Sequence, residues 1–89
     1  MVTIRIPALW RADAGGPEVK VEADNVGAAL RALGTRCPHL ARQILDSQGQ
    51  VNPNLNLFVN REAIRYHGEL SAPLTDGDEI YIVPMLSGG

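Results

Sequence analysis

The chain has 89 residues, 45% of them apolar, which is enough for one small domain with one modest hydrophobic core. Its formal net charge of −2 provides no basic field for nucleic acid or anionic lipid, and no apolar run approaches the roughly 20 residues of a membrane helix. A single cysteine, Cys37, permits no internal disulfide, and the first residues lack a secretory pattern. We therefore expect a one-domain cytoplasmic protein without nucleic-acid or membrane partners.

The first quarter of the chain predicts a β-hairpin. Apolar and polar residues alternate over residues 2–6, the period-two pattern of a half-buried strand, which ends at Pro7. A loop that contains Leu9 and Trp10 follows, and residues 18–22 alternate again. The two runs are expected to pair with each other.

A helix is predicted after the hairpin, with Asp24 or Asn25 as its N-cap and Gly34 as its end. Apolar residues recur there at the i, i+3, i+4, i+7 spacing of one helix face. They are Val26, Ala29, Leu30 and Leu33. Such a stripe needs a sheet to cover.

The second half predicts a short helix and three strands. Pro38 opens the helix, with its apolar residues on one face. Alternation indicates a strand over residues 55–59, and a brief turn at Arg61–Glu62 leads to another strand over residues 63–66. The Asp76–Gly77–Asp78 turn comes directly before the last strand. The order is strand, strand, helix, short helix and three strands.

This order predicts an α+β fold, in which the main helix lies across one face of a mixed sheet of about five strands. We expect residues 1–84 to form the domain and residues 85–89 to form a flexible tail. No internal repeat or interdomain linker interrupts the pattern.

The Gly88–Gly89 end indicates chemistry on the terminal carboxylate. A carboxylate is a poor electrophile until an enzyme couples it to a good leaving group, and the pocket that does so must admit the tail end-on. Because glycine has no Cβ, it lets the backbone lie in a narrow channel. We expect Leu86, Ser87 and Gly88 to occupy that channel and Gly89 to react.

The whole chain resembles the ThiS/MoaD family of ubiquitin-like sulfur carriers. Besides the element order and the terminal glycines, the resemblance rests on Asn56–Leu57–Phe58–Val59–Asn60, the Asp76–Gly77–Asp78 turn and the strand from Ile80 to Val83. Two further segments look most like the CysO-type carriers, which serve cysteine synthesis in actinobacteria. They are Ile6–Pro7–Ala8–Leu9–Trp10–Arg11 and the Gly15–Gly16 turn.

The resemblance implies a β-grasp fold whose Gly89 carboxylate is adenylated by an E1-like enzyme of the ThiF/MoeB type and then converted to a thiocarboxylate. The chain would then be a protein co-substrate and not an enzyme, with no bound cofactor, because the partner uses the ATP. The other implied partners are a sulfur donor and a sulfur-accepting enzyme. Cysteine synthase is the first choice, and thiazole, molybdopterin or thiosugar synthesis is also open.

Two other function classes stay open. In a ubiquitin-like modifier, a lysine amine attacks the adenylated Gly89 and forms an isopeptide bond. In a noncatalytic β-grasp interaction module, the Gly88–Gly89 end is incidental. Deleting the two glycines would silence a carrier and leave a binding module active.

The remaining reactive side chains favour structural roles. Cys37 has no CxxC partner, and Gly15–Gly16 lacks the spacing of a nucleotide-binding loop and is expected to form a turn. The two histidines, His39 and His67, lie far apart without a metal-ligand pattern. No nucleophile-elbow motif surrounds the serines, which are Ser47, Ser71 and Ser87. The sequence predicts no catalytic residue and no metal site.

Alternation also predicts a docking surface. If Leu57 and Ile82 point toward the helix, Phe58, Tyr81 and Val83 face the open side of the sheet and form an apolar patch that leads to the tail. We expect this patch to contact the activating enzyme. The alternative is that these side chains merely cover the sheet or are buried by the loop around Trp10.

Overall fold

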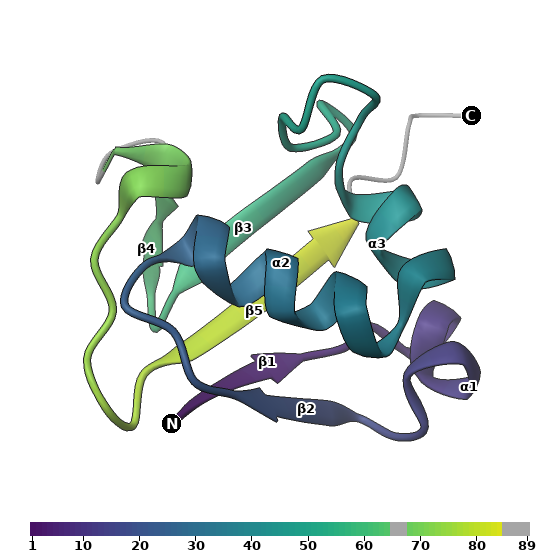
Figure 1. Cartoon of the computed structure of the whole chain (residues 1–89), viewed down its shortest axis with the longest axis horizontal. Coiled ribbons are helices and arrows are strands. Elements are labelled where there is room, and N and C mark those ends of the chain that lie inside the picture. The colour runs from purple at the N-terminus through teal and green to yellow at the C-terminus, as the bar shows by residue number, and fades with distance from the viewer. Residues whose placement is uncertain (65–67, 85–89) are drawn as a thin grey trace.

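The computed structural model describes residues 1–64 and 68–84. Five strands form one mixed sheet in the order β2-β1-β5-β3-β4, and α2 crosses one face of this sheet (Figure 1). The strands are β1 (Val2–Arg5), β2 (Glu18–Val21), β3 (Leu55–Val59), β4 (Glu62–Ala63) and β5 (Glu79–Pro84). The helices are α1 (Arg11–Ala14), α2 (Val26–Arg36) and α3 (Pro38–Ile44). The predicted two-layer α+β fold with one main helix is confirmed.

The β1–β2 hairpin is confirmed, but its connection is not the predicted loop. A single helical turn at Ala8–Trp10 leads directly into α1, which ends where Gly15 adopts the left-handed conformation with φ of 83°. Neither short helix buries a residue completely, so neither has the apolar stripe from which a helix is predicted.

The helix α2 begins as predicted, and Asn25 is its cap, because its Oδ1 atom accepts a hydrogen bond from the Ala28 N–H at 2.7 Å. The prediction that Gly34 ends the helix is wrong, since α2 continues to Arg36. A Cβ atom at Gly34 would lie 3.2 Å from the Cβ of Ala41 in α3. This glycine therefore permits the close approach of two helices.

The helix α3 starts at Pro38 as predicted and buries Leu40 and Ile44. Cys37 connects the two helices, and its N–H donates to the Leu33 carbonyl oxygen at 2.7 Å. The Cys37 side chain is half-buried and packs against the core. It has the packing role that its position predicted.

The strand β5 lies in the middle of the sheet. It is antiparallel to β3, where Tyr81 pairs with Phe58, and parallel to β1, where Tyr81 pairs with Arg5. Beside β3, the prediction for β4 needs correction because the strand covers Glu62–Ala63 and not residues 63–66, of which 65 and 66 lie outside the described residues. The turn moves back to Asn60, which is left-handed with φ of 56°.

The turn before β5 is confirmed and is held by side chains. The Asp78 carboxylate accepts hydrogen bonds from the Thr75 N–H and from the Asn60 side-chain amide. These hydrogen bonds, first that of the Thr75 backbone, hold the pKa of Asp78 below its ordinary value. The Asp76 carboxylate forms an ion pair with the Met1 amine, so the turn also anchors the start of β1.

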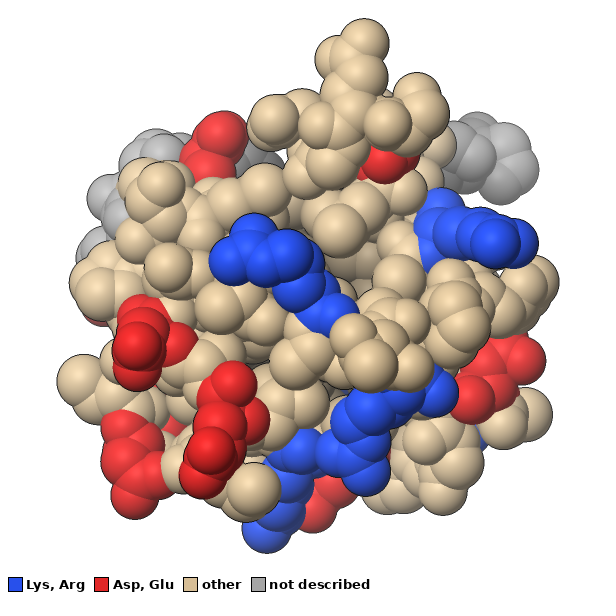
Figure 2. Space-filling model, in the orientation of Figure 1, with Lys and Arg blue, Asp and Glu red and all other residues tan. Residues whose placement is uncertain are grey.

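The core lies between the sheet and the helices and consists only of hydrophobic residues among those described. Its largest fully buried side chains are those of Ile4, Ile6, Leu30, Leu33, Leu40, Ile44 and Ile80. On the helical side of the molecule, basic side chains stand in separate groups, and acidic ones flank them (Figure 2). Among the described residues, the polar and charged side chains therefore lie at the surface or are only partly buried.

Candidate functional site

The predicted reactive segment, Leu86 to Gly89, lies outside the described residues. The structure does show where the chain leaves the sheet before this segment. Pro84 ends β5, the middle strand, and pairs with Leu55 of β3. Five residues follow Pro84, and a fully extended chain of that length spans at most about 18 Å. An enzyme that receives Gly89 must therefore place its reaction centre within that distance of the end of β5.

Three side chains gather on the open face of the sheet, as alternation predicted. Phe58 is the cross-strand neighbour of Tyr81, and Val83 lies two residues further along β5. Tyr81 is 37% exposed, Val83 is 43% exposed and Phe58 is half-buried, whereas Ile80 and Ile82 are buried on the helix side. We call Phe58, Tyr81 and Val83 the docking patch, after the partner contact that the sequence predicts for them and that the structure does not test.

The predicted alternative, in which the loop around Trp10 buries this patch, is wrong for Tyr81 and Val83. The Trp10 side chain packs against the hydrophobic core, whereas the two β5 side chains keep more than a third of their surface exposed. An aromatic and a branched apolar side chain that stand exposed directly before the tail suit a protein contact.

A polar network borders the docking patch, and the sequence did not predict it. The Tyr81 hydroxyl donates a hydrogen bond to Glu79 Oε1 at 2.6 Å, and Arg5 Nε donates to the same oxygen at 3.0 Å. Arg5 Nη1 also lies 3.0 Å from Glu18 Oε2. The network thus joins β2, β1 and β5 on the open face.

The network changes the acid–base properties of its members. The hydrogen bond from Tyr81, followed by that from Arg5, lowers the pKa of Glu79 below its ordinary value. The same Glu79 contact raises the pKa of Tyr81 and of Arg5. At neutral pH, Glu79 is therefore a carboxylate, Tyr81 a neutral phenol and Arg5 a cation.

The other candidate reactive groups do not come together. His39 is exposed, with its Nε2 atom 4.0 Å from Asp13 Oδ2, and Ser47 and Ser71 are exposed as well. His67 and Ser87 lie outside the described residues. Within residues 1–64 and 68–84, no three potential ligands among His, Cys, Asp and Glu could hold one metal ion.

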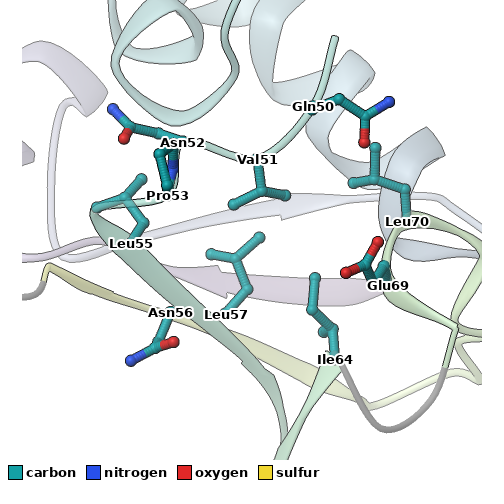
Figure 3. A pocket seen from close by; sticks show the side chains of 10 residues that line it. All are labelled: Gln50, Val51, Asn52, Pro53, Leu55, Asn56, Leu57, Ile64, Glu69 and Leu70. Atoms are coloured by element: carbon teal, nitrogen blue, oxygen red, sulfur yellow. The ribbon is translucent and has the colours of Figure 1, made fainter.

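A pocket of about 450 Å³ opens on the helix side of β3 (Figure 3). Leu55, Leu57 and Ile64 contribute apolar side chains, and Gln50 and Glu69 are polar members of its lining. Among the described lining residues, Glu69 is acidic and none is a lysine or an arginine. The Asn56 side chain points away from the other labelled side chains (Figure 3). Because Phe58 follows two residues later in β3 and alternate residues of a strand share a face, the docking patch lies on the other side of β3 from the buried Leu55 and Leu57.

Comparison with known proteins places the chain in a family. The model of the ThiS family matches residues 8–89, which include β5 and the terminal glycines. The chain belongs to the ThiS family. This membership confirms the resemblance found in the sequence, and the match extends to the carboxyl terminus.

Relatives of this ThiS-family chain include carriers and modifiers. Sulfur carrier protein CysO of Mycobacterium tuberculosis is 32% identical over 91 residues, which cover 99% of this chain and 98% of the relative. A chain in the crystal structure of the Amycolatopsis orientalis BexX/CysO complex superposes with a TM-score of 0.91 at 28% identity, and each chain is covered completely.

The solution structure of small archaeal modifier protein 1 from Methanosarcina acetivorans is also similar to this ThiS-family chain. Its TM-score is 0.85 at 31% identity, and the alignment covers 99% of this chain and 95% of the modifier. Together with the BexX/CysO structure, this likeness confirms the predicted β-grasp, ubiquitin-like fold.

The described part of the chain contains no helix that is both long enough and apolar enough to span a membrane. Its longest described helix, α2, has 11 residues.

Proposed function

We propose that the protein is a sulfur carrier, a co-substrate whose Gly89 carboxylate becomes a thiocarboxylate in the cytoplasm. The observation that carries this proposal is the ThiS family match over residues 8–89, in which the central strand β5 leads directly to Gly88–Gly89. The similarity to CysO over nearly the whole of both chains supports it. The entirely apolar core among the described residues suits a carrier that leaves the chemistry to its partners.

The proposed reaction has two steps on the terminal carboxylate. In the pocket of an E1-like partner of the ThiF/MoeB type, the Gly89 carboxylate attacks the α-phosphate of ATP and expels pyrophosphate. A sulfide equivalent from the sulfur donor then attacks the acyl-adenylate carbonyl, forms the C–S bond and expels AMP. The thiocarboxylate is ionised at neutral pH and presents its sulfur only where the carrier docks.

The docking patch is the surface that we assign to the adenylating enzyme. It combines exposed Tyr81 and Val83 with half-buried Phe58, and it lies on the strand that leads to the tail. Docking there would hold the end of β5 while the last residues enter the enzyme. The BexX/CysO complex supports partnership between a similar chain and a second protein. Cysteine synthesis is the first choice for the sulfur acceptor, by similarity to CysO, and the thiosugar, thiazole and molybdopterin pathways are the alternatives.

A second candidate function is protein modification. The likeness to small archaeal modifier protein 1 at 31% identity favours it specifically. The activation step would be the same, and a lysine amine would then attack the Gly89 acyl-adenylate and expel AMP. The two functions differ in the nucleophile and therefore in the product.

The product recovered from cells tests the proposal. We expect an antibody to recover the free chain with an alkylatable thiocarboxylate at Gly89, because sulfur is the proposed nucleophile. Mass spectrometry after iodoacetamide treatment identifies this end. The matched control lacks Gly88 and Gly89. Isopeptide conjugates without thiocarboxylate would establish the modifier. If the chain that lacks Gly88 and Gly89 kept the full cellular activity of the wild type, the protein would be a binding module.

A further inference from the structure

Tyr81 lies on the boundary between two halves of the open sheet face. On one side, Phe58 is its neighbour on β3, and on the other side Arg5 is its neighbour on β1. The Arg5 side chain contacts both Glu79 and Glu18, so the β1 and β2 half carries a linked set of charges. Any protein that covers the docking patch therefore meets an apolar surface beside a fixed polar one.

The partner of the Tyr81 hydroxyl decides whether this group donates or accepts their hydrogen bond. Glu79 is a carboxylate at neutral pH and can only accept hydrogen bonds. The Tyr81 hydroxyl, at 2.6 Å, is therefore the donor of the hydrogen bond to Glu79 Oε1. A hydroxyl has one proton and two lone pairs. With the proton committed to Glu79, Tyr81 offers an approaching protein only a hydrogen-bond acceptor.

We propose that Glu79 positions Tyr81 for recognition by the adenylating enzyme, keeping the ring at the edge of the docking patch and its hydroxyl oxygen available to an N–H donor of the enzyme. A backbone amide, Asn, Lys or Arg would supply that donor. The inference rests on the proposed function, because it names a chemical requirement on the proposed partner. Fixing the ring before binding also reduces the conformational entropy lost on docking.

A double-mutant cycle tests the inference, with an adenylating enzyme chosen because it adenylates the wild-type chain. We expect Tyr81→Phe and Glu79→Ala each to weaken binding by about three- to tenfold, the effect of one hydrogen bond. Because Glu79 acts through the Tyr81 hydroxyl, the two losses should not add. The dissociation constant of the double variant should equal that of the single variant with the lower affinity. Titration calorimetry measures the dissociation constants.

Two matched controls separate positioning from general structural damage. Glu79→Gln should bind within about twofold of wild type, because the Arg5 guanidinium, which only donates, holds the amide oxygen in place to accept the Tyr81 proton. Glu18→Ala removes only the outer contact of Arg5 and should leave affinity unchanged. Thermal melting of each variant shows whether the fold is retained.

A spectroscopic titration reports on the contact without the partner. In a Tyr66→Phe background, Tyr81 is the only tyrosine left, and its phenol absorbance gives its ionisation. The Glu79 hydrogen bond raises the pKa of Tyr81, and Arg5 acts weakly in the opposite direction. Glu79→Ala should therefore shift the ionisation to lower pH.

Three results would overturn the inference while leaving the proposed function intact. The first is wild-type affinity of Glu79→Ala or of Tyr81→Phe, and the second is a loss of affinity in the double variant equal to the product of the two single losses. The third is a Tyr81 ionisation that does not shift in Glu79→Ala. The proposed function fails separately, when the wild-type chain itself is not adenylated.

Discussion

A single residue added after Gly89 should abolish activation, because it hides the carboxylate that attacks ATP. Gly88→Val should act in the same direction by obstructing the channel with a branched side chain. We expect kcat/KM for adenylation to fall by about a hundredfold or more in both variants, since misplacing the reacting group is that costly. Both changes lie beyond Pro84, so thermal melting should stay near that of the wild type. The measurement is pyrophosphate release with the adenylating enzyme.

Two controls make the tail experiment specific. Ser87→Ala changes another residue of the predicted channel segment, but to a smaller side chain, and it keeps the free end and both glycines. If obstruction is the cause of the loss, this variant should be adenylated normally. Cleaving the added residue back to Gly89 with a protease should restore activity to the same preparation. Normal sulfur transfer by either the extended chain or Gly88→Val would refute the role of a free end in a narrow channel.

Truncation of the docking patch should produce the second large effect. We expect Phe58→Ala and Tyr81→Ala each to weaken partner binding by roughly 1 to 3 kcal/mol, which is about five- to 150-fold in the dissociation constant. Adenylation at limiting carrier concentration should slow in proportion, because loss of binding energy lowers kcat/KM. Tyr81 is exposed, so its variant should melt near the wild-type temperature, and half-buried Phe58 should show a modest decrease.

A matched control lies on the same face of the sheet. The exposed side chain of Lys20 is on β2, the edge strand two positions from β5, so Lys20→Ala should leave adenylation unchanged. If Phe58→Ala and Tyr81→Ala keep wild-type affinity while they lose much thermal stability, these side chains serve the fold and the docking assignment is rejected.

Local periodicity predicted the main elements because each main element buries one face. Leu55 and Leu57 are buried at a spacing of two, and Leu30 and Leu33 at a helical spacing, so their patterns can be read without knowledge of the partner surface. The same reasoning failed for α1, which buries no residue completely. It also failed at Gly34, whose role depends on Ala41 in another helix.

The docking patch and the polar network differ in what the sequence can predict. Alternation within β3 and β5 placed Phe58 and Tyr81 on the open face, because the direction of a side chain in a strand is a local property. The contact between Arg5 and Glu79 requires the parallel pairing of the first and last strands, which are separated by most of the chain. Alternation puts the charged side chains on that face and does not reveal that they are neighbours.

The most direct test of the central claim is the intact mass of the chain after incubation with ATP, a sulfide donor and each ThiF/MoeB-type enzyme of the same genome. We expect one of these enzymes to increase the mass by the difference between a sulfur and an oxygen atom, and fragmentation should place this change at Gly89. Omission of ATP should prevent it. An unchanged mass with all of these enzymes, each shown to be active on another carrier, would contradict the assignment as a sulfur carrier.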